Sequence, residues 1–294
     1  MPPAVHVAPE HDRAIEDAVR AAGGEPADLD AADALVWLDS NPDAFPESLP
    51  DGVRWVQLPA AGVERWLDRL DGDRLWTSAA GAYGRPVAEH ALMLMLAGSR
   101  RLADFARASS WTRPPLAPFE GSTIAIVGAG GIGRELIRML EPLRVEVLAV
   151  TRRGRDGTLP ADRLGEVWPR AHHVVIAAPA TAGTRHLVGA AELEAMRDDA
   201  WLVNVARGSL VDTEALVEAL AAGSIGGAAL DVTDPEPLPD GHPLWSERRA
   251  LITPHVANPD ATLRRYLAEL VEENVRRFAA GDELASLIDR EAGY

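Results

Sequence analysis

Three residues late in the chain have side chains suited to reducing a carbonyl group: Arg207 in VNVARGSLVD, Glu236 in LDVTDPEP and His255 in ITPHVAN. A guanidinium group can bind a carboxylate through two parallel hydrogen bonds and polarise a neighbouring carbonyl. A histidine, whose unperturbed pKa is about 6.5, can give up a proton near neutral pH, and a nearby carboxylate favours its protonated form. The set predicts a site that reduces a 2-keto acid.

Taken singly, each of the three has an ordinary structural interpretation. Arg207 could form a salt bridge in a loop, Glu236 lies between two prolines and could be a surface acid, and His255 could simply end a strand. Glu236 and His255 are also far apart in the sequence, so only the fold can bring them together. Their joint occurrence with a glycine motif upstream favours the functional interpretation.

That motif, VGAGGIG, has the G-x-G-x-x-G spacing and lies between a strand-like STIAIV and a helix-like GIGRELIRMLEPL. In this setting the first glycine permits a tight turn, the second lets the backbone approach a pyrophosphate, and the third permits close helix–strand packing. The free N–H groups of the helix start then face the phosphates. We expect a dinucleotide site formed by Gly128, Gly130, Gly131, Ile132 and Gly133.

The end of the next strand bears on the choice between NAD and NADP. VEVLAV continues into Thr151, Arg152 and Arg153, with no carboxylate in the turn to bind the adenosine ribose hydroxyls. Guanidinium groups bind phosphate well, so these residues favour NADP(H) with its 2′-phosphate. The alternative is a solvated arginine loop, which leaves NAD possible.

Composition excludes several other chemistries. The chain has no cysteine, and its 29 basic residues are all arginine, so thiolate and Schiff-base catalysis are absent. No histidine pair has metal-ligand spacing, and no G-x-S-x-G is present, so we expect neither a metal nor a serine nucleophile. A net charge of −16 argues against nucleic-acid and membrane partners. Without a signal-like start or a long apolar run, we expect a soluble, cytoplasmic protein.

The elements that must position these residues alternate along the chain. At 294 residues, two domains are expected. In the first, strands are predicted at 4–8, 34–38, 53–58 and 74–79, with helices at 13–22 and 63–70. From 123 onward a second alternation begins, and its adjacent apolar residues favour a parallel sheet covered on both faces.

Three further segments concern the connection between the domains. A helix at 87–102 is apolar on most of its circumference, so either a neighbouring domain or a second subunit must cover it. The proline-rich residues 112–121 are typical of a linker. A C-terminal helix at 261–281 is expected to pack on the first domain.

Seven segments together resemble one family, in the order found in that family. They are LPAAGVERW, GAYGRPVAEHALMLMLAGSRR, VGAGGIG, NVARGSLVDTEAL, ALDVTDPEPLP, HPLW and TPHVAN. Over nearly its whole length the chain is similar to D-isomer-specific 2-hydroxyacid dehydrogenases, in particular to glyoxylate/hydroxypyruvate reductases.

The resemblance implies an α/β fold of two lobes around a cleft, both with parallel sheets. The Rossmann-like dinucleotide-binding domain would comprise residues 93–261, and a smaller flavodoxin-like substrate domain would comprise 1–92 and 262–294. It also implies a homodimer built around the helix that follows PVAEH.

The same resemblance implies residue roles. Arg207 would clamp the substrate, His255 would be the acid/base, and Glu236 would be its partner. Backbone N–H groups of the turn at Ala61 and Gly62 would bind the substrate carboxylate. Residues lining the cofactor would be Ala178, Pro179, Val205, Ala206 and Asp231, the last at the nicotinamide carboxamide.

Two positions depart from the family pattern. Thr151 stands where members that prefer NAD commonly carry aspartate, which supports NADP. Thr233 stands where an aromatic residue often follows DV.

The expected activity is reduction of a glyoxylate- or hydroxypyruvate-type acid by NADPH, with a bulkier keto acid still open. The alternatives are a cofactor-sensing interaction protein without turnover, and a formate or phosphite dehydrogenase on the same fold. A sensor would need none of Arg207, Glu236 and His255.

Overall fold

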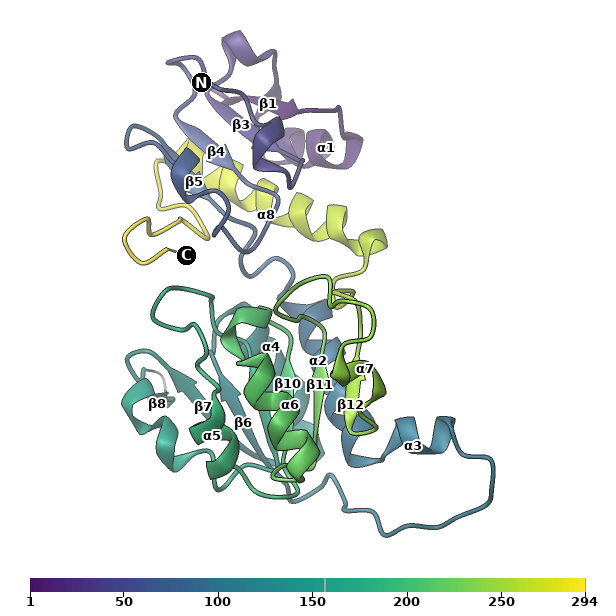
Figure 1. Cartoon of the computed structure of the whole chain (residues 1–294). Coiled ribbons are helices and arrows are strands. Elements are labelled where there is room, and N and C mark those ends of the chain that lie inside the picture. Colours follow the sequence, from purple (N-terminus) through teal and green to yellow (C-terminus); the bar gives the residue numbers. More distant parts are fainter. Residues whose placement is uncertain (156, 294) are drawn as a thin grey trace. The chain divides into compact units, whose positions relative to one another are not determined.

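The computed structural model describes residues 1–155 and 157–293 and divides the chain into two compact units. The first comprises 1–83 and 259–294, and the second comprises 84–258 (Figure 1). The expected boundaries at 92/93 and 261/262 instead fall inside two helices, α2 (Gly84–Ser99) and α8 (Asp260–Ala280). Each helix keeps its hydrogen bonds by staying within one unit, so the breaks lie at the helix starts.

The first unit contains a five-stranded parallel sheet in the order β2-β1-β3-β4-β5. This is the strand order of flavodoxin-like folds, and it confirms the expected architecture of the smaller domain. The strands are short: β1 (Ala4–Ala8), β2 (Glu25–Pro26), β3 (Ala34–Trp37), β4 (Trp55–Gln57) and β5 (Leu75–Thr77).

Helix α8 packs on this unit, as the sequence predicts, beside α1 (Arg13–Ala21). A buried polar network fastens it to the sheet, because Asn274 donates to Gln57 Oε1 at 3.0 Å and to Ala285 O at 3.2 Å. Gln57 Oε1 also accepts from Thr77 Oγ1 at 2.8 Å. Buried amides satisfied in this way hold a helix in one register.

The prediction of a helix at 63–70 was wrong. The segment forms a turn, in which Trp66 N donates to Val63 O, followed by a short 3₁₀ helix, Leu67–Arg69, in which Arg69 N donates to Trp66 O. Buried Val63, Trp66 and Leu70 are spaced by three and four residues, which suits a 3₁₀ turn as well as an α-helix.

The second unit contains a seven-stranded parallel sheet in the order β12-β11-β10-β9-β6-β7-β8. Counted from β6, this is the 3-2-1-4-5-6 order of a Rossmann fold with a seventh strand added. The strands are β6 (Thr123–Val127), β7 (Glu146–Thr151), β8 (Leu159–Pro160), β9 (His173–Ile176), β10 (Trp201–Asn204), β11 (Gly227–Leu230) and β12 (Ala250–Ile252).

The helices of this unit are α2, α3 (Leu102–Ala106), α4 (Gly131–Leu140), α5 (Ala190–Ala195), α6 (Thr213–Ala222) and α7 (Pro243–Ser246). Helix α2 packs against α4, β10 and β11. The approach is close: a Cβ on Gly98 of α2 would lie 2.5 Å from the Trp201 ring of β10.

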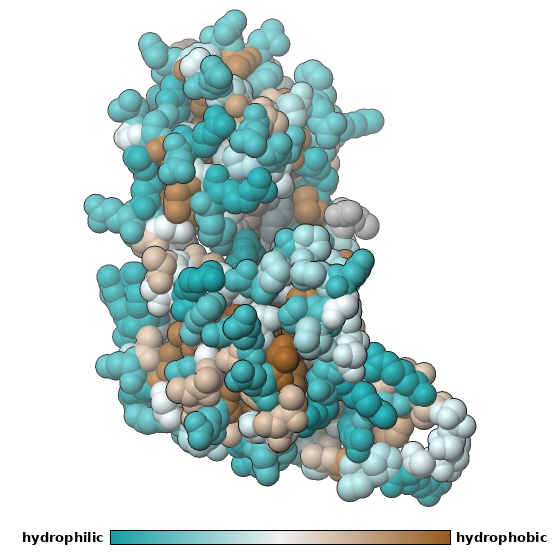
Figure 2. All heavy atoms as spheres, in the orientation of Figure 1, coloured by the Kyte–Doolittle hydropathy of each residue, from teal (hydrophilic) through white to brown (hydrophobic). Residues whose placement is uncertain are grey.

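The proline-rich segment expected as a linker runs between α3 and β6, inside the second unit. It extends away from the sheet together with α3 (Figure 1). Figure 2 shows white and light-brown residues among the hydrophilic ones on this projection. Among the described helices, none has the length and apolar character needed to cross a membrane.

Candidate active site

Arg207, Glu236 and His255 follow three neighbouring strands of the second unit. Arg207 comes after β10, Glu236 after β11 and His255 after β12, and these strands are adjacent in the sheet. Because the strands are parallel, the three loops leave from the same edge, where open α/β sheets bind ligands.

Glu236 and His255 are in direct contact. His255 Nδ1 lies 2.6 Å from Glu236 Oε1, with both side chains about half exposed. The other carboxylate oxygen accepts from Thr233 N at 3.4 Å. With Nδ1 engaged, Nε2 is the ring nitrogen of His255 that remains to exchange a proton with a ligand.

The loop carrying Glu236 is fastened at two further points. Thr233 donates from its hydroxyl to Pro235 O at 2.9 Å. Thr213 at the start of α6 donates to Asp234 O at 2.7 Å. These two hydrogen bonds hold residues 233–235 against the start of α6.

His255 has a left-handed backbone, with φ of 52°. Such a conformation is costly for a residue with a side chain and persists only where its surroundings impose it. Here the backbone N–H groups turn toward β11: His255 N donates to Asp231 O at 2.8 Å, Val256 N to Asp231 Oδ1 at 3.0 Å, and Ala257 N to Asp231 Oδ2 at 3.1 Å.

Asp231 is thus the anchor of the His255 loop, and its side chain is only 1% exposed. Its Oδ1 also accepts from Thr253 Oγ1 at 2.6 Å and lies 3.3 Å from His90 Nε2. Burial by itself raises the pKa of Asp231, but the hydrogen bonds from His90, Thr253 and the two backbone N–H groups outweigh it and lower that pKa below its ordinary value.

Arg207 lies in a turn held by the buried Asn204, which ends β10. Asn204 accepts from Ala206 N at 3.1 Å and donates to Arg207 O at 2.8 Å. The following residue, Gly208, touches the neighbouring loop, since a Cβ there would lie 1.9 Å from Thr233 O. The Arg207 and Glu236 loops are therefore in backbone contact.

The glycines of VGAGGIG have the environments that a dinucleotide site requires. Gly128 has φ of 105°, and a Cβ there would lie 2.5 Å from Ala177 O in the loop after β9. On Gly133 it would lie 2.2 Å from Gly128 O, which reflects close helix–strand packing. At Gly130 a Cβ would meet no described atom within 4 Å, so the backbone at the N-terminus of α4 is open to a ligand. These residues fit a pyrophosphate.

The other expected cofactor residues also follow strands of this sheet. Thr151 ends β7, and its hydroxyl accepts from Gly154 N at 3.1 Å, so it shapes the turn that presents the exposed Arg152 and Arg153. The remaining residues come after β9, β10 and β11, at the same edge as the glycines: Ala178, Pro179, Val205, Ala206 and Asp231.

Comparison with known proteins agrees with this geometry. Residues 91–257 match the family described as D-isomer specific 2-hydroxyacid dehydrogenase, NAD binding domain. The chain belongs to this family. An uncharacterized protein in the proB 3′ region of Corynebacterium melassecola is 41% identical over 280 residues, 91% of each chain. A glyoxylate reductase of Thermofilum pendens is 34% identical over 230 residues, 73% of this chain and 68% of the relative.

Solved structures of the family share the fold. A D-isomer specific 2-hydroxyacid dehydrogenase from Xanthobacter autotrophicus, in complex with NADPH and MES, has a TM-score of 0.85 at 26% identity and 100% coverage of both chains. An NADPH-dependent glyoxylate/hydroxypyruvate reductase from Sinorhizobium meliloti has a TM-score of 0.83 at 26% identity, covering 99% of this chain and 100% of that one. The protein is an NAD(P)-dependent D-2-hydroxyacid dehydrogenase.

Two residues expected at the dehydrogenase site, Ala61 and Gly62, lie in the first unit, in the loop after β4. The preceding Ala60 is held by Ala79 N, which donates to Ala60 O at 2.8 Å, and Tyr83 Oη donates to Pro59 O at 2.8 Å. Within the described residues no hydrogen bond takes up the N–H groups of Ala61 and Gly62. They keep the donor capacity that the expected role requires.

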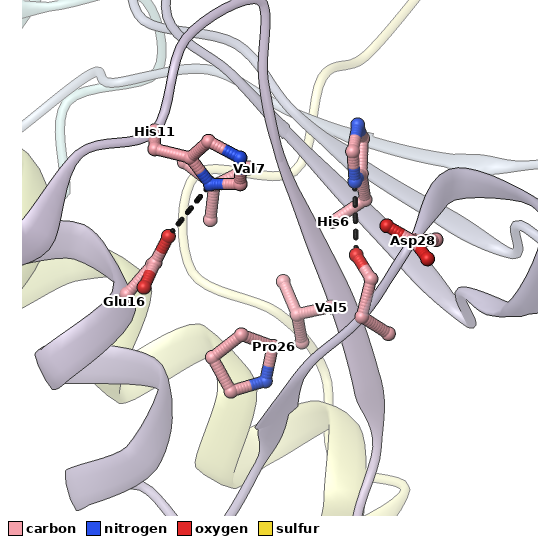
Figure 3. Close-up of a pocket in the computed structure, with 8 residues that line it drawn as sticks. Val5, His6, Val7, His11, Glu16, Pro26 and Asp28 are labelled. Carbon is pink, nitrogen blue, oxygen red and sulfur yellow. Dashed lines mark hydrogen bonds and ion pairs between the residues drawn. The ribbon is translucent and has the colours of Figure 1, made fainter.

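The first unit also has a surface hollow of about 390 Å³ beside β1, lined by His6, His11, Glu16 and Asp28 among others (Figure 3). Its histidines are already bonded through Nδ1, His6 to Ala27 O at 2.9 Å and His11 to Glu16 at 3.0 Å. Across the described residues, no group of three or more acidic or histidine side chains could hold a metal ion.

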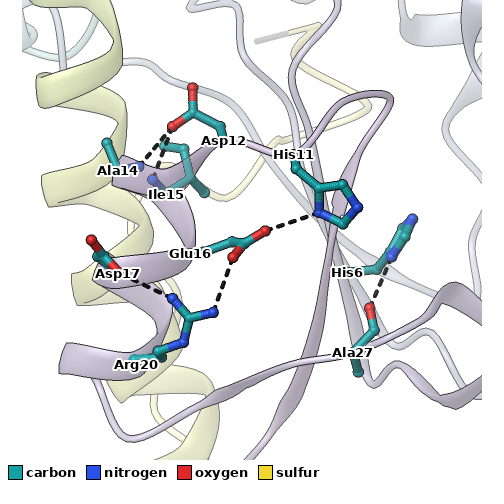
Figure 4. Close-up of polar contacts among 9 residues, drawn as sticks. All are labelled: His6, His11, Asp12, Ala14, Ile15, Glu16, Asp17, Arg20 and Ala27. Carbon is teal, nitrogen blue, oxygen red and sulfur yellow. Dashed lines mark hydrogen bonds and ion pairs between the residues drawn. The ribbon is translucent and has the colours of Figure 1, made fainter.

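Glu16 in this hollow belongs to the surface ion pairs of α1 (Figure 4). Hydrogen bonds from His11 and then Arg20 lower the pKa of Glu16 below its ordinary value. Asp12 meanwhile caps the helix by accepting from Ala14 N at 3.0 Å and Ile15 N at 3.1 Å. The polar groups of Asp12 and Glu16 therefore serve to stabilise α1. The candidate active site is the one in the second unit.

Three residues that support the site were missed by the sequence interpretation: His90, Asn204 and Thr253. Asn204 gave a weak signal, because a polar residue ends an otherwise apolar strand there. His90 lies within an apolar helix and Thr253 ends a strand, and neither position suggests the other. Their side chains meet at 2.9 Å although 163 positions separate them.

Proposed function

We propose that this dehydrogenase reduces a small 2-keto acid to the D-2-hydroxy acid, with His255 as proton donor and Arg207 as carboxylate clamp. The observation that carries the proposal is the 2.6 Å contact of His255 Nδ1 with Glu236, on loops beside that of Arg207. A bound reduced nicotinamide supplies the hydride. His255 gives the proton from Nε2 to the carbonyl oxygen, while Glu236 holds the ring through Nδ1.

We also propose that the first unit takes part in substrate binding through the N–H groups of Ala61 and Gly62, for which the described residues offer no hydrogen-bond acceptor. Backbone N–H groups of this kind can bind a carboxylate. A glyoxylate- or hydroxypyruvate-type acid is the leading candidate, which the names of the similar Thermofilum pendens and Sinorhizobium meliloti enzymes support.

A panel of keto acids tests this function. Glyoxylate, hydroxypyruvate, pyruvate and phenylpyruvate are each mixed with NADPH or NADH, and the loss of reduced-nicotinamide absorbance is followed. We expect turnover with the smaller acids, and the His255→Ala variant to lower kcat by about 10²- to 10⁴-fold because general acid catalysis is lost.

The control is His11→Ala, which removes a histidine side chain that is 91% exposed in the first unit. It should leave kcat unchanged. If the wild-type protein reduces none of the acids but oxidises formate or phosphite, the keto-acid proposal is wrong and the formate or phosphite alternative holds. Cofactor binding without any turnover would favour a sensor.

We further propose a preference for NADPH over NADH, carried by Arg152 and Arg153. Both side chains are exposed in the turn after β7, at the sheet edge that also carries the glycine motif. Paired guanidinium groups suit a 2′-phosphate, and the similar structures named above include one solved with NADPH and one named as NADPH-dependent.

Replacing Arg152 and Arg153 together by serine tests this preference. The KM for NADPH should rise by about tenfold or more, because a charge-assisted contact is worth about 1.5 to 3 kcal/mol, while the KM for NADH stays nearly constant. Arg163→Ser is the matched control, since Arg163 is paired with Glu166 at 2.6 Å on the surface. Equal losses with both cofactors would contradict the assignment.

We also propose that the enzyme is a homodimer. Six large apolar side chains between positions 93 and 116 of the second unit are exposed, among them Trp111 at 90% and Leu102 at 57%; the others are Met93, Leu96, Phe105 and Leu116. Large apolar side chains that lie on one exposed stretch of chain suit an interface with another protein surface. A second copy related by a twofold axis would bury the same surface on both chains.

A further inference from the structure

His90 has no place in the proposed chemistry, yet its ring is directed at the group that anchors the His255 loop. It lies on α2, and its side chain is 14% exposed. His90 Nε2 is 2.9 Å from Thr253 Oγ1 and 3.3 Å from Asp231 Oδ1. A histidine so placed contacts both the first residue of the loop and its anchoring carboxylate.

The direction of each hydrogen bond follows from the partners. Thr253 Oγ1 donates its single proton to Asp231 Oδ1 at 2.6 Å, so toward His90 it can only accept. His90 Nε2 must therefore carry a proton, which it shares between Thr253 and Asp231. The His90 side chain is therefore the donor, and Thr253 Oγ1 and Asp231 Oδ1 are the acceptors.

Asp231 is linked to His255 by hydrogen bonds from the backbone of the His255 loop. The N–H groups of His255, Val256 and Ala257 all donate to Asp231, and Thr253 N donates to Leu230 O at 2.9 Å. These bonds impose the left-handed backbone of His255. Loss of one support would let the loop relax toward a less strained conformation.

Helix α2 is a firm base for this arrangement because it packs tightly within the unit. Its buried residues include Ala88, Ala91, Leu94 and Met95, and a Cβ on Gly84 would lie 2.7 Å from Gly131 O of α4. A side chain projecting from such a helix has little freedom to move away.

We propose that His90 is a positioning residue for the reaction: through Asp231 and Thr253 it fixes the loop that aims His255 at the substrate. The inference rests on the proposed function, in which His255 donates the proton. His90 itself touches no reacting atom.

The test uses the full-length protein with glyoxylate and NADPH. His90→Leu should lower kcat by about 10- to 100-fold, as expected for a misplaced catalytic group, with little change in the KM for glyoxylate or in the NADPH dissociation constant measured by fluorescence. His90→Gln, which keeps an N–H donor, should recover most of the rate. Glu89→Gln, exposed on the same helix, is the matched control.

A second readout does not depend on turnover. The imidazole NMR resonances of His255 should shift in His90→Leu and remain in place in Glu89→Gln. In a double-mutant cycle, Thr253→Val combined with His90→Leu should cost less than the sum of the two single changes, because both act through one network. Thr253→Val against Thr253→Ser repeats the test should His90→Leu fail to fold.

Unchanged kcat and unchanged His255 resonances in His90→Leu would overturn the inference, as would a rate loss explained wholly by weaker NADPH binding. Wild-type protein that reduces no keto acid would refute the proposed function instead. The His255 resonances would then still decide whether His90 holds the loop.

Discussion

At the scale of single residues, Gly208 shows how tightly the candidate site is assembled. The nearest neighbours of a Cβ at this position would be Thr233 O at 1.9 Å and Asp234 N at 2.6 Å. These are backbone atoms, which cannot turn aside as a flexible side chain can. Glycine is required here because two loops touch.

Gly208→Ala should therefore separate the Arg207 loop from the Glu236 loop. We expect kcat/KM for the keto acid to fall by about 100-fold, since small displacements of positioned groups have effects of that size. Steady-state kinetics measures the loss. Gly165→Ala, where a Cβ would meet no described atom within 4 Å, should behave as wild type; an active Gly208→Ala would show that the contact is not needed.

At the scale of elements, β9 and α2 meet through a buried histidine. His173 Nε2 lies 2.9 Å from Ser99 Oγ, whose own proton goes to Met95 O at 3.0 Å, so Nε2 carries a proton and Nδ1 is a bare acceptor. Within the described residues Nδ1 has no partner. Burial, with a smaller effect of His172, lowers the pKa of His173 to about 4.

This shift predicts a pH dependence of stability. The unfolded chain, with a histidine pKa of about 6.5, binds the proton more readily than the folded chain does. The stability contributed by neutral His173 is therefore fully present above about pH 6.5 and is lost as the pH falls toward 4. The His173 contribution to that loss should be about 2 to 3 kcal/mol by pH 4.5.

Guanidinium unfolding at pH 7 and pH 4.5 measures the effect. His173→Phe keeps an aromatic ring beside Phe119 and should lose less stability between the two pH values than wild type. His186→Asn, at a partly exposed histidine, should keep the wild-type dependence. Identical pH dependence in His173→Phe and wild type would refute the prediction.

At the scale of the whole molecule, the projection formed by α3 and the residues after it bears on assembly. Light scattering after gel filtration should give the mass of a dimer, about twice 31.4 kDa. Phe105→Ser with Trp111→Ser should shift the protein toward monomer, because both remove exposed apolar area from the proposed interface. Leu75→Thr, at an apolar residue 44% exposed in the first unit, is the control. A monomeric wild type would contradict the proposal.

Much of this molecule could be predicted from local patterns. The strands at 4–8, 34–38 and 123–127 and the two alternations were predicted because apolar runs bounded by turn residues need no long-range information. The prediction of a helix at 63–70 was wrong because apolar residues spaced by three and four positions do not distinguish a 3₁₀ turn from an α-helix. The domain boundaries differed because helix continuity depends on which unit buries the helix.

Residue types at short spacing predicted the fold class, the glycine motif, the family and the candidate residues Arg207, Glu236 and His255, because none of these requires long-range information. How those residues are held depends on the three-dimensional fold. The 2.6 Å contact of His255 with Glu236, the closeness of Gly208 to Thr233, and the bonds of His90 to Thr253 and Asp231 join segments far apart in the chain. Such contacts arise from strand order and helix packing, which set distances that no local pattern encodes.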